Sequence, residues 1–317
     1  MDEKNMTMIT VIHLLGFWTP PNVTCLVFFL FLLLYCVTIC GNLLIITLVS
    51  YSKTLHSPMY FFLSQLAVSD ILLATDVVPN MLHAFWVETT TTISVSNCIT
   101  QLYFFAVSET SECLLLTLMS YDRYLAICKP LHYSMLMNHR FCWMTVITSW
   151  SLSFIAVLIY TLDISKLHFC GPNIINHFFC DLDPILQLSC SDTTLVQLLV
   201  TLSTLTFGVI PFFIIIVSYV YIIVTIFEIP SITGRQKVFS TCSSHLTVVS
   251  IFYSTLLFVY LIPSRGQSLN ITKYISLLYT VLTPLINPII YSLRNKELKK
   301  VAGKMINNFL RFHFCSH

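Results

Sequence analysis

The chain has 317 residues, of which 56% are hydrophobic and only 9% are charged, and its mean hydropathy is +0.82. Because a soluble domain carries about 25% charged residues, this composition argues against a water-soluble enzyme and against a disordered chain. The formal net charge of +2 is too small to indicate a nucleic-acid-binding protein, so the composition points to a helical membrane protein.

Seven apolar runs are each long enough to cross a bilayer, which takes roughly 20 residues. They cover residues 25–49, 59–82, 98–119, 141–161, 197–227, 238–262 and 275–291. Their many β-branched and aromatic residues would favour strands in water, but in lipid the backbone must satisfy its own hydrogen bonds, and runs of this length form helices. The sequence predicts an all-α membrane protein, a single seven-transmembrane helix bundle over residues 1–317.

The basic residues of the short connections predict the orientation of the bundle. With the N-terminus outside, twelve Lys and Arg residues lie on the cytoplasmic side and four on the outer side, which is the distribution that membrane proteins favour. Residues 292–317 then form a basic cytoplasmic tail, in which Leu298, Val301, Met305 and Phe309 recur at spacings of three and four. This spacing favours a short amphipathic helix on the anionic inner leaflet over a frayed, solvated tail.

Four cysteines fall on the expected outer side, where disulfides form, namely Cys98, Cys170, Cys180 and Cys190. Four cysteines allow three pairings, and their spacing does not choose among them. A bond from Cys98, at the outer end of the third span, into the long loop between the fourth and fifth spans would hold that loop over the bundle.

Acidic residues within the spans need an explanation, because an acid at mid-membrane costs about 2.5–3.5 kcal/mol. We expect Asp70 and Glu112 to form an interior polar cluster with Asn42 and Asn287. One hypothesis is that this cluster holds a proton or a monovalent cation. The alternative is a neutral hydrogen-bonded network that fixes helix packing. No other cofactor and no other metal site is expected.

The residues Asp122-Arg123-Tyr124, at the cytoplasmic end of the third span, place an acid beside a base. A permanent surface ion pair would be worth little, but a pair that opens would act as a switch. Prolines within the spans remove backbone hydrogen bonds and form either hinges or static kinks. They are Pro79, Pro211, Pro284 and Pro288. The histidines are scattered and no glycine-rich phosphate loop is present, so the sequence does not indicate an enzyme.

Several short motifs resemble those of the rhodopsin-like G-protein-coupled receptors. They are Gly41-Asn42, Asp70, Cys98, Asp122-Arg123-Tyr124, Pro211 and Asn287-Pro288-Ile289-Ile290-Tyr291. Longer motifs narrow the resemblance to odorant receptors. They are PMYFFL at 58–63, MSYDRYLAIC at 119–128, KVFSTCSSHL at 237–246, PLINP at 284–288 and YSLRN at 291–295. The loop from Cys170 to Asp181 resembles the larger, tetrapod-type class of odorant receptors (class II), which implies the pairs Cys98–Cys180 and Cys170–Cys190.

The resemblance implies an odorant receptor in the plasma membrane of olfactory sensory cilia. A small, mostly apolar molecule would bind in an outer-half pocket and activate a stimulatory, olfactory-type G protein that raises cyclic AMP. The expected pocket residues are Phe105, Ala106, Glu109, Thr110, Ser203, Phe207, Leu256, Leu257, Tyr260 and Thr280. The expected coupling and switch residues are Asp122, Arg123, Tyr124, Tyr219, His245 and Tyr291. Two alternatives remain, an ion-coupled transporter that uses the intramembrane acids and a membrane scaffold without a ligand.

Asp76 and Glu109 depart from the family pattern, in which these positions tend to be neutral. We expect them at comparable depths on neighbouring helices, where two carboxylates would share a proton. One hypothesis is that both are protonated and bond to Thr75, Ser108 or Thr110. The other is that Glu109 faces the ligand and favours amines.

The chain also contains three acceptor patterns for N-glycosylation, at Asn5, Asn22 and Asn270. Because Asn22 and Asn270 lie close to the expected membrane surface, where access is poor, we predict glycosylation at Asn5.

Overall fold

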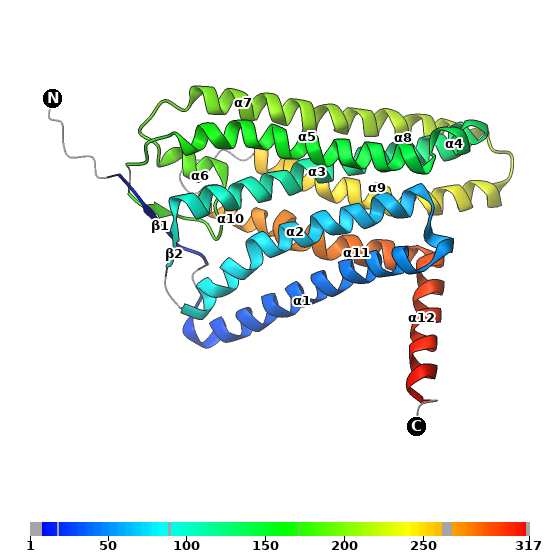
Figure 1. Cartoon of the computed structure of the whole chain (residues 1–317), viewed down its shortest axis with the longest axis horizontal. Coiled ribbons are helices and arrows are strands. Elements are labelled where there is room, and N and C mark those ends of the chain that lie inside the picture. Colours follow the sequence, from blue (N-terminus) through cyan, green and yellow to red (C-terminus); the bar gives the residue numbers. More distant parts are fainter. Residues whose placement is uncertain (1–7, 18, 88–89, 171, 262–267, 315–317) are drawn as a thin grey trace.

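The structure is a computed structural model that describes residues 8–17, 19–87, 90–170, 172–261 and 268–314. Its long helices lie side by side along one common axis (Figure 1). Within the described residues, six helical spans are long and apolar enough to cross a membrane, and a seventh is present if Ile232–Ser240 and Cys242–Phe258, bent by 43°, count as one span. This arrangement confirms the predicted helical membrane bundle.

The described helical spans extend beyond the predicted apolar runs at both ends, except that the span predicted at 238–262 does so only at its start. The spans are α1 (Pro21–Tyr51), α2 (Pro58–Val87), α3 (Val95–Cys128), α5 (His139–Ser165), α7 (Thr194–Thr204) with η2 (Leu205–Val209) and α8 (Ile210–Glu228), α9 (Ile232–Leu261), and α10 (Ser268–Leu277) with η3 (Leu278–Leu282) and α11 (Thr283–Arg294). Shorter helices are η1 (Lys53–Leu55), α4 (Pro130–Leu136) and α6 (Leu182–Gln187), and α12 (Lys296–Phe314) follows the last span. The extensions arise because a helix keeps its own hydrogen bonds after it leaves the hydrocarbon layer.

Two spans change their winding directly before a proline. The π-helical segments η2 and η3 precede Pro211 and Pro284, which lie in the first turns of α8 and α11. Proline lacks an N–H and its ring clashes with the carbonyl four residues earlier, so a wider turn at this point relieves the clash. Pro79 and Pro288 instead lie inside continuous helices. Two of the four prolines therefore follow a local change in helical winding, and the other two do not interrupt their helices.

A small sheet, which the all-α prediction did not include, lies at one end of the bundle (Figure 1). Strand β1 (Val11–Leu14) pairs antiparallel with β2 (Thr91–Ser94) and parallel with β3 (Ile174–Ile175), in the order β2-β1-β3. The strands bring the N-terminal segment, the α2–α3 connection and the long loop together. Asn5, the predicted glycosylation site, lies outside the described residues.

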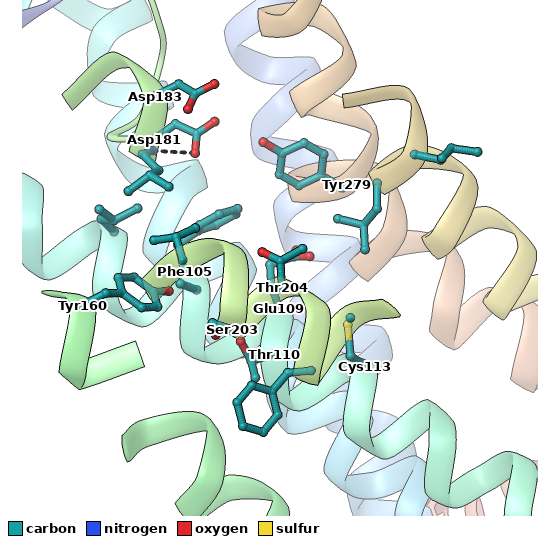
Figure 2. A pocket seen from close by; sticks show the side chains of 18 of the residues that line it. Phe105, Glu109, Thr110, Cys113, Tyr160, Asp181, Asp183, Ser203, Thr204 and Tyr279 are labelled. Atoms are coloured by element: carbon teal, nitrogen blue, oxygen red, sulfur yellow. Dashed lines mark hydrogen bonds between the residues drawn. The ribbon is translucent and has the colours of Figure 1, made fainter. Parts of the chain in front are cut away.

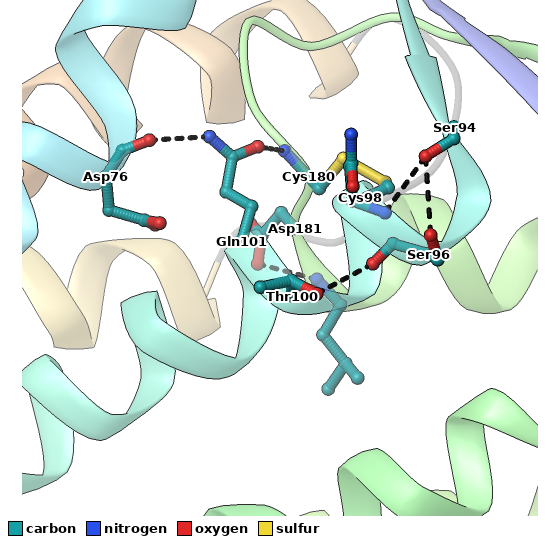
Figure 3. Close-up of a disulfide and its surroundings, with 10 residues drawn as sticks. Asp76, Ser94, Ser96, Cys98, Thr100, Gln101, Cys180 and Asp181 are labelled. Atoms are coloured by element: carbon teal, nitrogen blue, oxygen red, sulfur yellow. Dashed lines mark hydrogen bonds between the residues drawn. A yellow bond between two sulfur atoms is a disulfide. The ribbon is translucent and has the colours of Figure 1, made fainter.

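Two disulfides hold the long loop at this same end, which we call the disulfide end. They join Cys98 to Cys180, with 5.4 Å between the Cα atoms, and Cys170 to Cys190, with 5.9 Å. These are the pairs that the family resemblance implied. Beside the first disulfide, the Gln101 side chain donates to the carbonyl oxygen of Asp76 at 2.8 Å and accepts from the Cys180 N–H at 3.0 Å (Figure 3). The loop is therefore fixed to both α2 and α3.

The opposite end of the bundle, where α3 ends shortly after Arg123, is called the Arg123 end. Helix α12 turns away from the common axis at this end (Figure 1). Leu298 and Val301 are buried on one face of α12, while Lys299 and Lys300 are exposed. This distribution matches the amphipathic helix that was predicted for the tail.

The outer faces of the spans are apolar and exposed. Leu33 on α1, Ile147 on α5 and Phe213 on α8 are 58–60% exposed. A continuous apolar surface of this kind fits lipid rather than water.

Helix α1 lies against α11 at a glycine. A Cβ atom added to Gly41 would lie 3.2 Å from the Pro288 Cγ atom. One residue further, the Asn42 side-chain amide donates to the carbonyl oxygen of Pro284 at 3.0 Å. The absent side chain at Gly41 thus permits the close approach that lets Asn42 reach its partner.

We predict that Gly41→Leu lowers the free energy of unfolding by about 1–3 kcal/mol, because the added side chain forces α1 and α11 apart. The thermal unfolding temperature of the detergent-solubilised protein measures this effect. Gly303→Leu is the matched control, since a Cβ atom there meets nothing within 4 Å. Equal unfolding temperatures for the two variants would contradict the packing role of Gly41.

Candidate functional site

A cavity of about 610 Å³ lies between the helices near the disulfide end. Small-molecule sites typically have volumes of about 300–1,000 Å³. The cavity lies among α3, the long loop with α6, the α7–η2–α8 span and α9, and its lining is largely apolar and aromatic. The aromatic side chains in the lining are Phe105, Tyr160, Phe207, Phe212, Tyr253 and Tyr279.

Most of the pocket residues expected from the sequence line this cavity. They are Phe105, Ala106, Glu109, Thr110, Ser203, Phe207, Leu256 and Leu257. Thr280 does not line it, because its hydroxyl turns back into its own helix and donates to the carbonyl oxygen of Ser276 at 2.7 Å. The side chain of Tyr260 lies outside the described part of the structure.

The loop residues that cover the cavity were not predicted from the sequence. Asn176, His177, Asp181 and Asp183 all contribute to its lining. They lie there because the disulfide at Cys180 brings this stretch of the loop over α3. The implied pairing of Cys98 with Cys180 was the signal that could have located these loop residues, because it places their stretch of the loop next to α3.

The lining of the cavity contains acidic side chains. Three acids contribute to it, Glu109 from the bundle and Asp181 and Asp183 from the loop (Figure 2). Burial raises the pKa of Asp181 to about 6. Burial and the positive charge of Lys273 lower the pKa of His177 to about 3, so that this imidazole is neutral at physiological pH. No Lys or Arg is among the described residues of the lining.

Glu109 is buried without a partner. Both of its carboxylate oxygens are inaccessible to water, and neither has a hydrogen-bond partner among the described residues. Ser108 cannot serve as that partner, because its hydroxyl donates to the carbonyl oxygen of Phe104 at 3.0 Å. The hypothesis that Glu109 bonds to neighbouring hydroxyls is therefore wrong for this structure.

Asp76 takes a different position from the one expected. It does not line the cavity, and the structure shows no hydrogen bond between Asp76 and Glu109 among the described residues. Its carbonyl oxygen is held by Gln101 instead (Figure 3). The structure thus gives no support to a shared proton between these two acids.

Three members of the expected interior cluster come together in the bundle core. The Asn287 side-chain amide donates to the two Asp70 oxygens at 3.0 and 3.2 Å and to a Glu112 oxygen at 3.3 Å. Asn42 does not join them, because its amide donates to the carbonyl oxygens of Thr38 and Pro284. The cluster is therefore the trio of Asp70, Glu112 and Asn287.

At the Arg123 end, Asp122 has two partners. One carboxylate oxygen accepts from the Arg123 Nε–H at 3.0 Å, and the other accepts from the Tyr133 hydroxyl at 2.8 Å. Burial and the neighbouring carboxylate raise the pKa of Tyr133 above its usual value, so the hydroxyl remains a donor. Tyr133 lies on α4 and was not expected from the sequence. The Tyr133 hydroxyl thus fixes the Asp122 carboxylate, which in turn binds Arg123.

A second polar contact at this end links three helices. The Tyr219 hydroxyl on α8 lies 2.6 Å from Nδ1 of His245 on α9, and Nε2 of His245 lies 3.2 Å from the Leu116 carbonyl oxygen on α3. His245 is fully buried. Tyr291 is also buried, and the Tyr124 ring packs edge-on against that of Tyr221. The structure thus places all six expected switch residues in this half of the bundle.

Comparison with known proteins identifies the family. A family model described as "Olfactory receptor" matches residues 31–308. The chain is 45% identical to human olfactory receptor 5G3 over 96% of this chain and 97% of that protein. It is 46% identical to human olfactory receptor 10A7 over 96% of both chains, and 45% identical to mouse olfactory receptor 5G9 over 96% and 97%. The comparisons lend no support to the transporter alternative. The chain belongs to the olfactory receptor family and is a multi-pass membrane protein.

Proposed function

We propose that the protein is an odorant receptor that binds small, mostly apolar molecules in the 610 Å³ cavity and activates a stimulatory G protein, which raises cyclic AMP. The observation that carries this proposal is the layout of α3. The cavity-lining residues Phe105 and Glu109 lie toward one end of this helix, and the Asp122–Arg123 pair lies toward the other. Its relatives are named as receptors, which supports a receptor rather than an enzyme.

In this proposal the disulfide end faces the outside of the cell. Disulfides persist in oxidising surroundings, and basic residues concentrate at the cytoplasmic ends of spans. Four basic residues at or near helix ends at the Arg123 end would favour an acidic surface on the G protein. They are Lys129, Arg140, Arg235 and Lys237. Helix α12 would lie on the inner leaflet of the plasma membrane, in the sensory cilia that the family resemblance implies.

Ligand binding can activate the receptor only if the ligand prefers the active arrangement of the helices. Leu256 and Leu257 on α9 line the cavity, and His245 on the same helix lies against α3 and α8. We expect an outward movement of α9 at the Arg123 end to break the His245 contacts. Arg123 would then leave Asp122 and bind the G protein.

The trio of Asp70, Glu112 and Asn287 would hold a proton or a monovalent cation between the cavity and the Arg123 end. Two buried carboxyl groups bonded to one amide need a positive charge or a proton, since both cannot ionise cheaply in this interior. A bound cation predicts that a higher sodium concentration stabilises the protein, whereas a proton, or a neutral network that only fixes packing, predicts no such effect.

We predict that Arg123→Ala abolishes the cyclic AMP response to an agonist without loss of receptor at the cell surface. Lys166→Ala is the control, because Lys166 also pairs with an acid, Asp163, at 2.7 Å, but is exposed near the disulfide end. Cyclic AMP and surface staining are measured in the same cells. A full response from the Arg123 variant would exclude the proposed coupling.

We predict that Tyr133→Phe raises basal cyclic AMP by up to about tenfold. The substitution removes one donor to Asp122, and a hydrogen bond to a charged group is worth about 1.5 kcal/mol. Asp122 then holds Arg123 less firmly. Basal cyclic AMP at equal surface expression provides the measurement, and an unchanged or lower value would show that Tyr133 does not restrain the pair.

A further inference from the structure

We propose that the cavity selects ligands that carry a protonated amine on an apolar body, with the carboxylate of Glu109 as the counter-ion. This inference rests on the proposed function, in which the cavity is the ligand site. It concerns the chemical class of the ligand, which membership of the family does not specify.

The first observation is the unpaired carboxylate of Glu109. A buried polar group without a partner is unfavourable, and a buried charge without one is more so. Glu112, three residues further along the same helix, already accepts a hydrogen bond from Asn287 at 3.3 Å. Glu109 has no such partner among the described residues, although it lines the cavity. A ligand ammonium group supplies both the positive charge and three N–H donors.

The second observation is that the protein supplies no cation of its own to the described part of the lining. His177 is neutral, and Lys273 is not among the lining residues but bonds to one of them, Asn176. The Lys273 ammonium donates to the Asn176 side-chain oxygen at 3.0 Å and lies 5.1 Å from the centre of the Phe17 ring. Among the described residues, none offers Glu109 a positive charge, so a ligand ammonium group is the partner that we propose for it.

The third observation is the character of the remaining lining. Figure 2 shows Glu109 among the side chains that line the cavity, together with Phe105 and Tyr279 from the helices and Asp181 and Asp183 from the loop. Aromatic faces attract cations, so they favour an ammonium group as well as an apolar body. The three acids repel carboxylates and phosphates. The lining therefore selects for positive charge and against negative charge.

The test uses the purified full-length protein in lipid nanodiscs and measures ligand affinity from the ligand-dependent shift of the unfolding temperature. The probes are an amine, an alcohol and a carboxylic acid on each of three skeletons, phenylethyl, cyclohexylethyl and heptyl. We expect at least one amine to bind roughly tenfold more tightly than its alcohol, and every acid to bind most weakly. A panel in which the amines do not lead, or in which nothing binds, would overturn the proposal.

Glu109→Gln should weaken amine binding by about 30-fold and change alcohol binding little, because only the charge is lost. Asp76→Asn is the matched control, since it removes a buried acid that does not line the cavity. Glu109→Asp keeps the charge on a shorter side chain and should keep the amine ranked first, which covers the case in which Glu109→Gln does not fold. An unchanged ranking in Glu109→Gln would remove Glu109 from the ligand contacts.

The same panel, applied to cells with a cyclic AMP readout, separates this proposal from the proposed function. Amine binding to the purified protein without any cyclic AMP response would contradict the coupling and leave the ligand class standing. A cyclic AMP response to alcohols and acids but not to amines would contradict the proposed ligand class and leave the coupling standing.

Amine affinity should also fall as the pH is lowered through about 6, where Asp181 gains a proton and loses its negative charge. The other carboxyl groups and the imidazole among the described lining residues belong to Glu109, Asp183 and His177, and His177 stays neutral over this range. In Asp181→Asn the part of the pH dependence that is due to this residue should disappear, while the preference for amines should remain. An identical pH profile in the variant would show that Asp181 does not act on the ligand.

Discussion

The interior of this bundle favours arrangements in which each buried polar group finds a partner within the protein, because lipid offers none and an unpaired buried polar group is unfavourable. Most of the polar side chains described above have such partners across helices, as Gln101, Asn287 and His245 do. Glu109 is the one described acid of which both oxygens are buried and unpaired. Glu109 also lines the cavity, and we therefore assign the partner that it lacks to the ligand.

Helix α3 connects the two ends of the molecule. The disulfide at Cys98 and the two hydrogen bonds of Gln101 hold its first turns, and Asp122, restrained by Tyr133, holds Arg123 near its last. The helices around α3 are less regular. The η2 and η3 segments interrupt two spans before Pro211 and Pro284, and η2 contributes Phe207 to the cavity. A continuous central helix surrounded by spans with local irregularities provides a physical basis for movement at one end in response to binding at the other.

Hydropathy alone predicted the spans, because a helix that crosses a bilayer needs about 20 consecutive apolar residues, and few other structures contain apolar runs of that length. It did not predict how each helix is rotated. The spans are apolar on the lipid side as well as in the core, so the sequence shows no clear polar face that would have separated Asp76 from the cavity that Glu109 lines. Asn42 was misplaced for the same reason, since its backbone partners depend on the close approach at Gly41. The sheet was missed because strands of two to four residues carry too little pattern, and the loop acids because their position depends on a disulfide.

The central claim is that the cavity holds the ligand and that Glu109 receives its charged group. The most direct measurement is a cryo-electron microscopy structure of the protein with the tightest-binding amine of the panel. We expect density for the ligand within the cavity, with its nitrogen about 2.7–3.2 Å from a Glu109 carboxylate oxygen. A ligand bound elsewhere, or one in the cavity with its nitrogen directed away from Glu109, would contradict the account.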